Sequence, residues 1–191
     1  VRDEFQDAKP AQFQRNVKKL LLTFGGTDPR NLSSTIYHYI RGFCQQQNIE
    51  IYIVTGPGYR GYDRLLEETS GEKNVYLTHN TGVISGIMEK VQIAITSNGR
   101  TVYELAHMNI PAIVISHHER EQTHSFACEE NGFTQVGIYK KGYTENVVAL
   151  ELKKLILDEG YRRKMFKRIE PHQFDQNNSR VLHAIEKILN V

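Results

Sequence analysis

The sequence has little of what marks secreted or membrane proteins. It has no tryptophan, and its two cysteines, Cys44 and Cys128, form no CxxC pair. Such cysteines argue against a disulfide framework and fit a reducing, cytoplasmic compartment. No apolar run approaches the ~20 residues that a membrane-spanning helix needs, and no signal peptide is recognisable. We therefore expect a cytoplasmic protein without a membrane span.

An excess of charge of one sign is also missing. The 24 basic and 22 acidic residues leave a formal net charge of +2, whereas nucleic-acid-binding proteins usually present a strongly basic face. With 39% hydrophobic and 24% charged residues, the composition is that of a globular chain with a packed core. A length of 191 residues allows one large domain or two small ones. We expect no nucleic-acid partner.

The first residues lack an initiator methionine. The opening stretch VRDEFQDAKPAQFQRN is polar, so we expect residues 1–17 to be a linker or the end of a preceding domain. Residues 18–191 are expected to form one domain of a longer protein. Ordinary processing of a tag or terminus is the alternative.

Short apolar runs alternate with helical patterns from Lys19 to Gly137. The runs are mostly continuous, which is typical of strands buried on both faces of a parallel sheet. The pattern predicts strands at 19–24, 49–54, 73–77, 91–96, 110–116 and 133–137, with helices at 31–46, 61–69, 82–89, 100–108 and 121–131, and a helical C-terminal tail at 145–158, 160–169 and 179–189. The predicted fold class is α/β, a Rossmann-like doubly wound parallel six-stranded sheet with the order 3-2-1-4-5-6.

A glycine loop, TFGGTDPRN, follows the first predicted strand. Gly25 and Gly26 let a ligand approach the backbone, and Thr27 adds a hydroxyl. Asp28 and Pro29 predict an N-cap and first helical position, so that the following helix offers free N–H groups that suit a phosphate. The loop is neither a Walker nor a GxGxxG motif, so a tight turn explains it equally well on its own.

A second glycine loop follows the fourth predicted strand. Ser97 or Asn98 can cap the next helix, and Gly99 again permits close approach. In the order 3-2-1-4-5-6 the first and fourth strands are neighbours, and ligands bind in the crevice at their carboxyl ends. The two loops together therefore predict a ligand that carries phosphate. Glu104 follows, where a carboxylate can bind ribose hydroxyls; the alternative is a solvated charge on the helix surface.

The stretch HHEREQTH, residues 117–124, has metal-ligand residue types without the right spacing. It is not HExxH, because His118 and His124 are six positions apart and lie on different faces of a helix. We expect no metal. Two interpretations remain, a polar lining of the same crevice, where His117 or His118 orients a phosphate or sugar hydroxyl, and an exposed helix start. Cys128 is expected in a helix core rather than as a nucleophile.

These residues resemble a known family. The run ITSNGRTVYELAHMNIPAIVISHHEREQTHSFACEENGF, with TFGGTDPRN upstream, is similar to the C-terminal half of GT-B-fold nucleotide-sugar enzymes. The nearest resemblance is to the UDP-sugar hydrolase of the pseudaminic acid pathway and to spore-coat polysaccharide biosynthesis proteins. A more distant one is to the lipid-linked N-acetylglucosaminyltransferase of peptidoglycan synthesis. The resemblance covers residues 19–137, and the helical tail in outline.

The resemblance implies where a UDP-sugar would bind. The diphosphate would face both glycine loops, and the ribose would contact Glu104. The uracil would contact the stretch 79–84. The sugar or phosphate end would contact the stretch after the fifth strand. The implied binding residues are Gly25, Gly26, Thr27, His79, Val83, Ile84, Ser97, Asn98, Gly99, Arg100, Thr101, Glu104, His118, Glu119, Glu121 and Gln122. No further cofactor is implied.

The resemblance also implies a partner half. GT-B enzymes have two domains with the active site between them, and in hydrolase-like members the proposed catalytic histidine belongs to the N-terminal half, outside this sequence. We expect UDP or a UDP-amino sugar as ligand, and a hydrolase of bacterial surface-glycan synthesis of the nonulosonic acid type, inactive without that half. One alternative is a glycosyltransferase C-terminal domain. The other is a non-catalytic nucleotide-sugar-binding module fused to a sugar nucleotidyltransferase.

Overall fold

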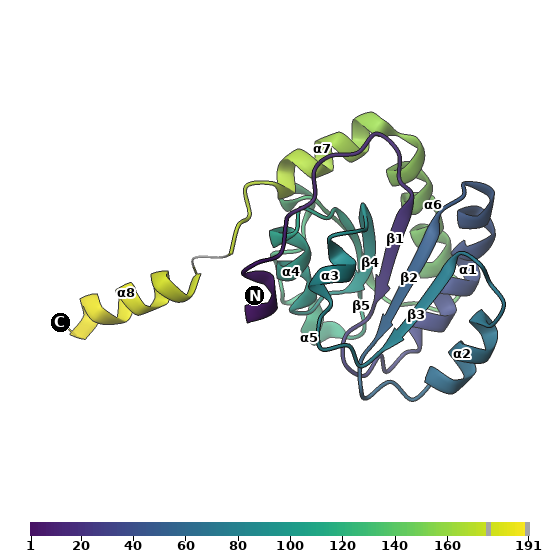
Figure 1. Ribbon diagram of the computed structural model, residues 1–191, viewed down its shortest axis with the longest axis horizontal. Coiled ribbons are helices and arrows are strands. Elements are labelled where there is room, and N and C mark those ends of the chain that lie inside the picture. The colour runs from purple at the N-terminus through teal and green to yellow at the C-terminus, as the bar shows by residue number, and fades with distance from the viewer. Residues whose placement is uncertain (175–176, 190–191) are drawn as a thin grey trace.

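Six parallel strands form the centre of the computed structural model, which describes residues 1–174 and 177–189 (Figure 1). Their order, β3-β2-β1-β4-β5-β6, confirms the predicted one. The strands are β1 (Lys19–Thr23), β2 (Glu50–Thr55), β3 (Val75–His79), β4 (Ile93–Ser97), β5 (Ala112–Ser116) and β6 (Phe133–Ile138). Because β1 pairs with β4, with Thr23 opposite Thr96, the two strands that precede the glycine loops end side by side.

Helices follow the strands as the apolar pattern predicted, although α3 is shorter than the predicted stretch 82–89. The helices are α1 (Leu32–Gln46), α2 (Tyr62–Thr69), α3 (Ser85–Met88), α4 (Thr101–His107), α5 (Glu119–Gln122), α6 (Thr144–Leu157), α7 (Glu159–Ile169) and α8 (Asn177–Leu189), with 3-10 turns η1 (Asp3–Phe5) and η2 (Glu129–Asn131). The three helices of the predicted C-terminal tail are α6, α7 and α8.

The predicted helix at 121–131 is wrong. Helix α5 ends at Gln122, because the fully buried side chain of Asn98 donates to the backbone oxygens of Glu121 and His124, at 2.7 and 3.1 Å. In a continuing helix those oxygens would accept from the next turn. Cys128, expected in a helix core, therefore has extended backbone just before η2.

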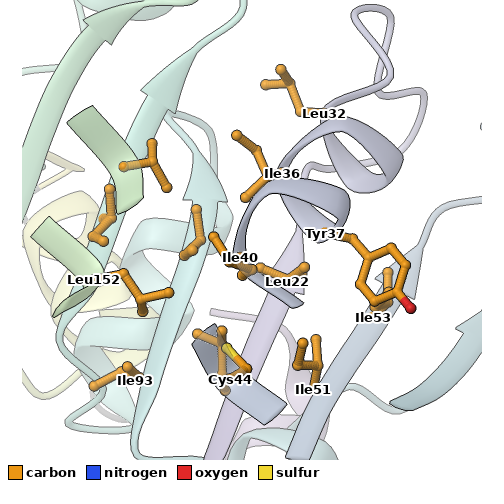
Figure 2. Packing of buried hydrophobic residues seen from close by; sticks show 14 of the residues in the cluster. Leu22, Leu32, Ile36, Tyr37, Ile40, Cys44, Ile51, Ile53, Ile93 and Leu152 are labelled. Carbon is orange, nitrogen blue, oxygen red and sulfur yellow. The ribbon is translucent and has the colours of Figure 1, made fainter. Parts of the chain in front are cut away.

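The buried residues of β1 divide between the two faces of the sheet. Leu20 and Leu22 belong to a core cluster with side chains of α1 and α6, and Leu21 belongs to a second cluster with α4. Figure 2 displays Leu22 beside Ile40 of α1. Since successive side chains of a strand point to opposite faces, a strand covered on both sides needs a continuous apolar run.

Residues 1–17 lie along α4 and α7 before the chain enters β1 (Figure 1). Phe5 is completely buried in the cluster that contains α4. The N–H of Ala11 donates to the backbone oxygen of Met108 at 2.9 Å, and the guanidinium of Arg162 donates to the backbone oxygen of Arg15. The segment thus packs on the domain, and its assignment as a linker or the end of a preceding domain stays a prediction.

Helix α8 lies at the other end of the chain and projects away from the sheet (Figure 1). Its apolar side chains Val181, Leu182, Ile185 and Ile188 are between 47% and 79% exposed. Across residues 1–174 and 177–189, no helix has both the length and the apolar character that crossing a membrane requires.

Candidate functional site

A cavity of about 800 Å³ lies at the carboxyl ends of the central strands. The loops after β1, β2, β3, β4 and β5 form its wall, together with the first two residues and Phe174. Polar, glycine and loop residues of the wall include Gly25, Gly26, Thr27, Gly56, Pro57, Asn80, Thr81, Ile84, Ser97, Gly99, Arg100, Thr101, Glu104, His117, His118 and Glu121. The two predicted glycine loops and Glu104 thus meet around one cavity.

The loop after β1 packs tightly against the loop after β2. Gly25 has a φ of 78°, in the left-handed region that favours glycine. The N–H of Gly58 donates to the backbone oxygen of Gly26 at 2.9 Å, and a Cβ on Gly56 would lie 2.4 Å from the Cα of Gly26. Only glycine fits at position 56. Gly56 is not among the residues predicted from the sequence, although its position directly after the second strand was a usable signal.

Asp28 caps α1 in a way that the sequence pattern did not predict. The helix begins at Leu32 rather than at Pro29. The buried carboxylate of Asp28 accepts hydrogen bonds from the N–H groups of Leu32 and Ser33, both at 2.8 Å. The expectation that this helix offers free N–H groups to a phosphate is wrong for these two donors, because a carboxylate already occupies the place of an anion.

The loop after β4 is arranged differently. Helix α4 begins at Thr101, and no side chain of the described residues caps it, so the expected cap by Ser97 or Asn98 is wrong. Asn98 is instead turned toward the loop after β5, as described above. A Cβ on Gly99 would meet no atom within 4 Å, so this backbone is open on that side. The N–H groups of Val102 and Tyr103 donate to the backbone oxygens of Gly99 and Arg100, at 3.3 and 3.1 Å, and no side chain accepts from the first turn of α4.

Part of the histidine-rich stretch faces the cavity. His117 is 3% exposed, with Nε2 3.3 Å from the backbone oxygen of Phe24; because a carbonyl only accepts, Nε2 carries a proton. The N–H of His117 donates to the Glu121 carboxylate at 2.7 Å. His118 and Glu121 line the cavity as well. Among the residues described, no group of three or more His, Cys, Asp or Glu side chains is placed to hold a metal ion.

Glu104 is a buried carboxylate in the cavity wall. It is 7% exposed, so the alternative of a solvated surface charge is wrong. Arg2 donates to both of its oxygens, from Nε to Oε1 at 2.8 Å and from Nη2 to Oε2 at 3.3 Å, and Nη1 of Arg2 pairs with Glu4 at 2.8 Å. Burial acts to lower the pKa of Arg2, but the hydrogen bond and charge of Glu104, with the charge of Glu4, raise this pKa overall. No motif in the sequence indicates this role for Arg2.

The stretch after β3 contributes other residues than His79 and Val83. The His79 ring stacks on Tyr62 with centroids 4.3 Å apart, and Val83 is 58% exposed. Asn80, within the stretch 79–84 that the resemblance assigns to the uracil, lines the cavity together with the expected Ile84. The residues implied by the resemblance that lie outside the wall are His79, Val83, Asn98, Glu119 and Gln122.

Comparison with known proteins yields no matching family model. A curated but uncharacterized protein of Methanocaldococcus jannaschii is 25% identical over 151 residues, covering 75% of this chain and 31% of that protein. The chain therefore spans less than a third of the length of this relative.

Solved structures share the fold over nearly the whole chain. A UDP-GlcNAc 2-epimerase from Neisseria meningitidis, bound to UDP-GlcNAc, superposes with a TM-score of 0.68 at 17% identity, covering 92% of this chain and 46% of that one. MurG from Acinetobacter baumannii superposes with a TM-score of 0.70 at 14% identity, covering 96% of this chain and 55% of that one. S. aureus MnaA, in a co-structure with UDP, superposes with a TM-score of 0.68 at 16% identity, covering 98% of this chain and 48% of that one.

At these identities the likeness establishes the fold alone. The chain spans about half the length of each solved neighbour, and the pseudaminic acid hydrolase family is not singled out among them. The chain therefore has the α/β fold that makes up about half of each of these proteins.

Proposed function

We propose that this chain is the UDP-sugar-binding domain of a larger nucleotide-sugar enzyme. The observation that carries the proposal is the meeting of both glycine loops and the buried Glu104 around one cavity of about 800 Å³. The rule that doubly wound sheets bind ligands where strand order reverses supports the same place. Proteins that share the fold are in structures with UDP or UDP-GlcNAc.

The diphosphate binds mainly at the loop after β4. There the backbone at Gly99 is open on its Cβ side and no side chain caps α4. The N–H groups of Gly99, Val102 and Tyr103 already donate to backbone oxygens of the loop and first turn, so we assign the N–H groups of Arg100 and Thr101 to the phosphate oxygens. Ser97 adds a hydroxyl and Arg100 a positive charge at the same wall. The loop after β1 contributes backbone at Gly26 but not the start of α1, since the Asp28 carboxylate would repel a second anion there.

The nucleoside extends from the diphosphate toward Glu104 and the loop after β3. The carboxylate of Glu104 accepts hydrogen bonds from the ribose hydroxyls, as acidic residues do in dinucleotide folds. The base lies along the wall that Asn80 and Ile84 form, beside the loop after β2, since the N–H of Asn80 donates to the backbone oxygen of Thr55 at 2.9 Å.

The reaction that we propose for the intact protein is hydrolysis of a UDP-amino sugar in surface-glycan synthesis of the nonulosonic acid type. Water attacks either the anomeric carbon, whose bond to the UDP oxygen breaks with its electron pair going to UDP, or the β-phosphorus, whose bond to the sugar oxygen breaks with its electron pair going to that oxygen. A proton of the water passes to solvent or to the released oxygen, and UDP and the free sugar are the products in both cases. This domain stabilises the negative charge on the leaving phosphate through N–H groups and Arg100, and a partner half supplies the groups that act on the sugar.

A glycosyltransferase is the second candidate, because an O-GlcNAc transferase in complex with UDP and GlcNAc shares the fold, with a TM-score of 0.64 at 13% identity. In that case an acceptor hydroxyl takes the place of water, and the role of this domain is unchanged.

Calorimetry tests the binding site. We expect UDP to bind more tightly than AMP or inorganic phosphate. Glu104→Ala should lower the affinity for UDP on the order of tenfold, because hydrogen bonds to a charged group contribute about this much. The affinity for pyrophosphate should not change. Equal affinity for UDP, AMP and phosphate would refute the nucleotide site, and equal losses for UDP and pyrophosphate would remove the ribose role of Glu104.

A second experiment tests the reaction. The chain is expressed together with the sequence that precedes it in its gene, and UDP and UMP release from UDP-N-acetyl amino sugars is followed with and without a sugar acceptor. Release without an acceptor is the expected result, whereas release that requires one assigns the protein to the transferases.

A further inference from the structure

The N-terminal segment brings Arg2 to the wall of the proposed nucleotide cavity, 102 positions away from its partner Glu104. The segment is held by more than this one side chain. Phe5 is fully buried, and its backbone oxygen lies 3.2 Å from Nε2 of His107. The N–H of Lys9 donates to Glu89 at 2.8 Å. The place of Arg2 is therefore fixed by contacts of the whole segment with α4 and the end of α3.

Arg2 holds both oxygens of the Glu104 carboxylate at once. Its Nε and Nη2 donate to Oε1 and Oε2 at 2.8 and 3.3 Å, a two-bond arrangement that fixes the plane of a carboxylate as well as its place. Each carboxylate oxygen has two acceptor positions, so one remains on each oxygen. Two acceptors side by side match the two hydroxyls of a vicinal diol.

Glu4 keeps Arg2 from turning away. One of its oxygens pairs with Nη1 of Arg2 at 2.8 Å, and the other accepts the N–H of Ser85 at 3.1 Å. Arg2 therefore lies between two carboxylates, that of Glu104 in α4 and that of Glu4 in η1. A buried carboxylate that loses its cation is costly, so removal of Arg2 would free Glu104 to rotate toward other donors.

We propose that Arg2 is a positioning residue for Glu104, and that residues 2–5 belong to the ribose subsite and make it selective for nucleotides with a 2′,3′-diol. This inference rests on the proposed function, because it requires UDP in this cavity. It adds that selectivity between ribose and deoxyribose depends on the segment before the sheet.

The test compares UDP, 2′-deoxyuridine diphosphate and pyrophosphate by calorimetry. We expect the unaltered chain to bind UDP on the order of tenfold more tightly than the deoxy analogue. Arg2→Ala should bring that ratio close to one while pyrophosphate affinity is unchanged. Arg2→Lys should keep part of the ratio, because a single ammonium group replaces one fork of two donors. Arg15→Ala, which removes an exposed charge from the same segment, should leave the ratio unchanged.

The outcomes separate the two claims. If the unaltered chain does not bind UDP, the proposed function fails and this inference fails with it. If UDP binds but Arg2→Ala and Arg2→Lys both keep the full preference for ribose, only the inference is overturned. Tighter UDP binding by Arg2→Ala also overturns it, because Arg2 would then compete with the ribose. A thermal unfolding curve of each variant establishes that the affinities refer to folded protein.

Discussion

The loops after β1 and β4 have the same sequence character and different structures. Each follows a buried strand, contains glycine and leads into a helix. After β1, the carboxylate of Asp28 occupies the first N–H groups of the 15-residue helix α1. After β4, the seven-residue helix α4 begins without a side-chain cap, and Gly99 is open on its Cβ side.

The difference teaches that a glycine after a strand does not identify an anion site. What decides is whether the helix N-terminus already has an anion. At α1 it has one, and Gly26 is packed against the loop after β2. At α4 side chains supply none, and for this reason we propose the loop after β4 for the diphosphate.

The largest effect expected from this comparison is on stability at the loop after β1. Gly56→Ala places a Cβ 2.4 Å from the Cα of Gly26 and 2.6 Å from its oxygen, and backbone cannot move aside as a flexible side chain can. We expect a loss of about 1–3 kcal/mol in the free energy of unfolding, measured by urea denaturation. Gly99→Ala is the matched control and should change stability by less than about 0.5 kcal/mol. Equal losses in both variants would contradict the contrast.

The cap of α1 should give the next largest effect. Asp28→Ala removes the acceptor for two N–H groups and should cost about 0.5–2 kcal/mol of unfolding free energy. Asp28→Asn keeps one acceptor oxygen and should therefore cost less unfolding free energy. It should not lower the affinity for UDP, because it removes a negative charge near the phosphate. Weaker UDP binding by Asp28→Asn would mean that the charge is not repulsive there.

A smaller effect is expected on binding at the loop after β4. Gly99→Ala should weaken UDP by about threefold to tenfold, the worth of one hydrogen bond to the backbone, since the added methyl group stands where a phosphate oxygen approaches. Isothermal titration measures this change. A variant that binds UDP as tightly as the unaltered chain would place the diphosphate elsewhere.

The smallest effect concerns acid stability on the α1 side of the comparison. Burial raises the pKa of Glu68, but hydrogen bonds from His38, Arg64 and Ser34 outweigh it and lower this pKa from 4.5 to about 2. A carboxylate with a lowered folded-state pKa stabilises the fold at pH values above its unfolded-state pKa, and this contribution is lost as the pH falls toward the folded-state value.

Thermal unfolding as a function of pH measures this contribution. Glu68→Gln should be less stable than the unaltered chain near pH 7, and the two should converge between pH 4.5 and about 2. Because Arg64 is 79% exposed, we expect a difference of less than about 1 kcal/mol. Parallel curves over the whole range would contradict the assigned pKa.

The sheet and the position of the cavity were predictable from local pattern. The continuous apolar runs KLLLTF and VQIAIT gave strands buried on both faces, and their order placed both glycine loops at one edge. The predicted helix at 121–131 failed because Asn98, more than 20 positions earlier in the chain, donates to the carbonyl groups that would continue it. Local pattern carries no information about such a donor.

The sequence by itself determined the secondary structure of the core, the strand order and the edge at which the cavity lies, because hydrophobic periodicity and strand handedness are local or topological properties. The tertiary structure alone decided which groups at that edge are free. It assigned Asp28 to the cap of α1, Gly56 to contact with Gly26, and Arg2 to Glu104. Those roles follow from contacts between residues far apart in the chain, and packing alone brings them together.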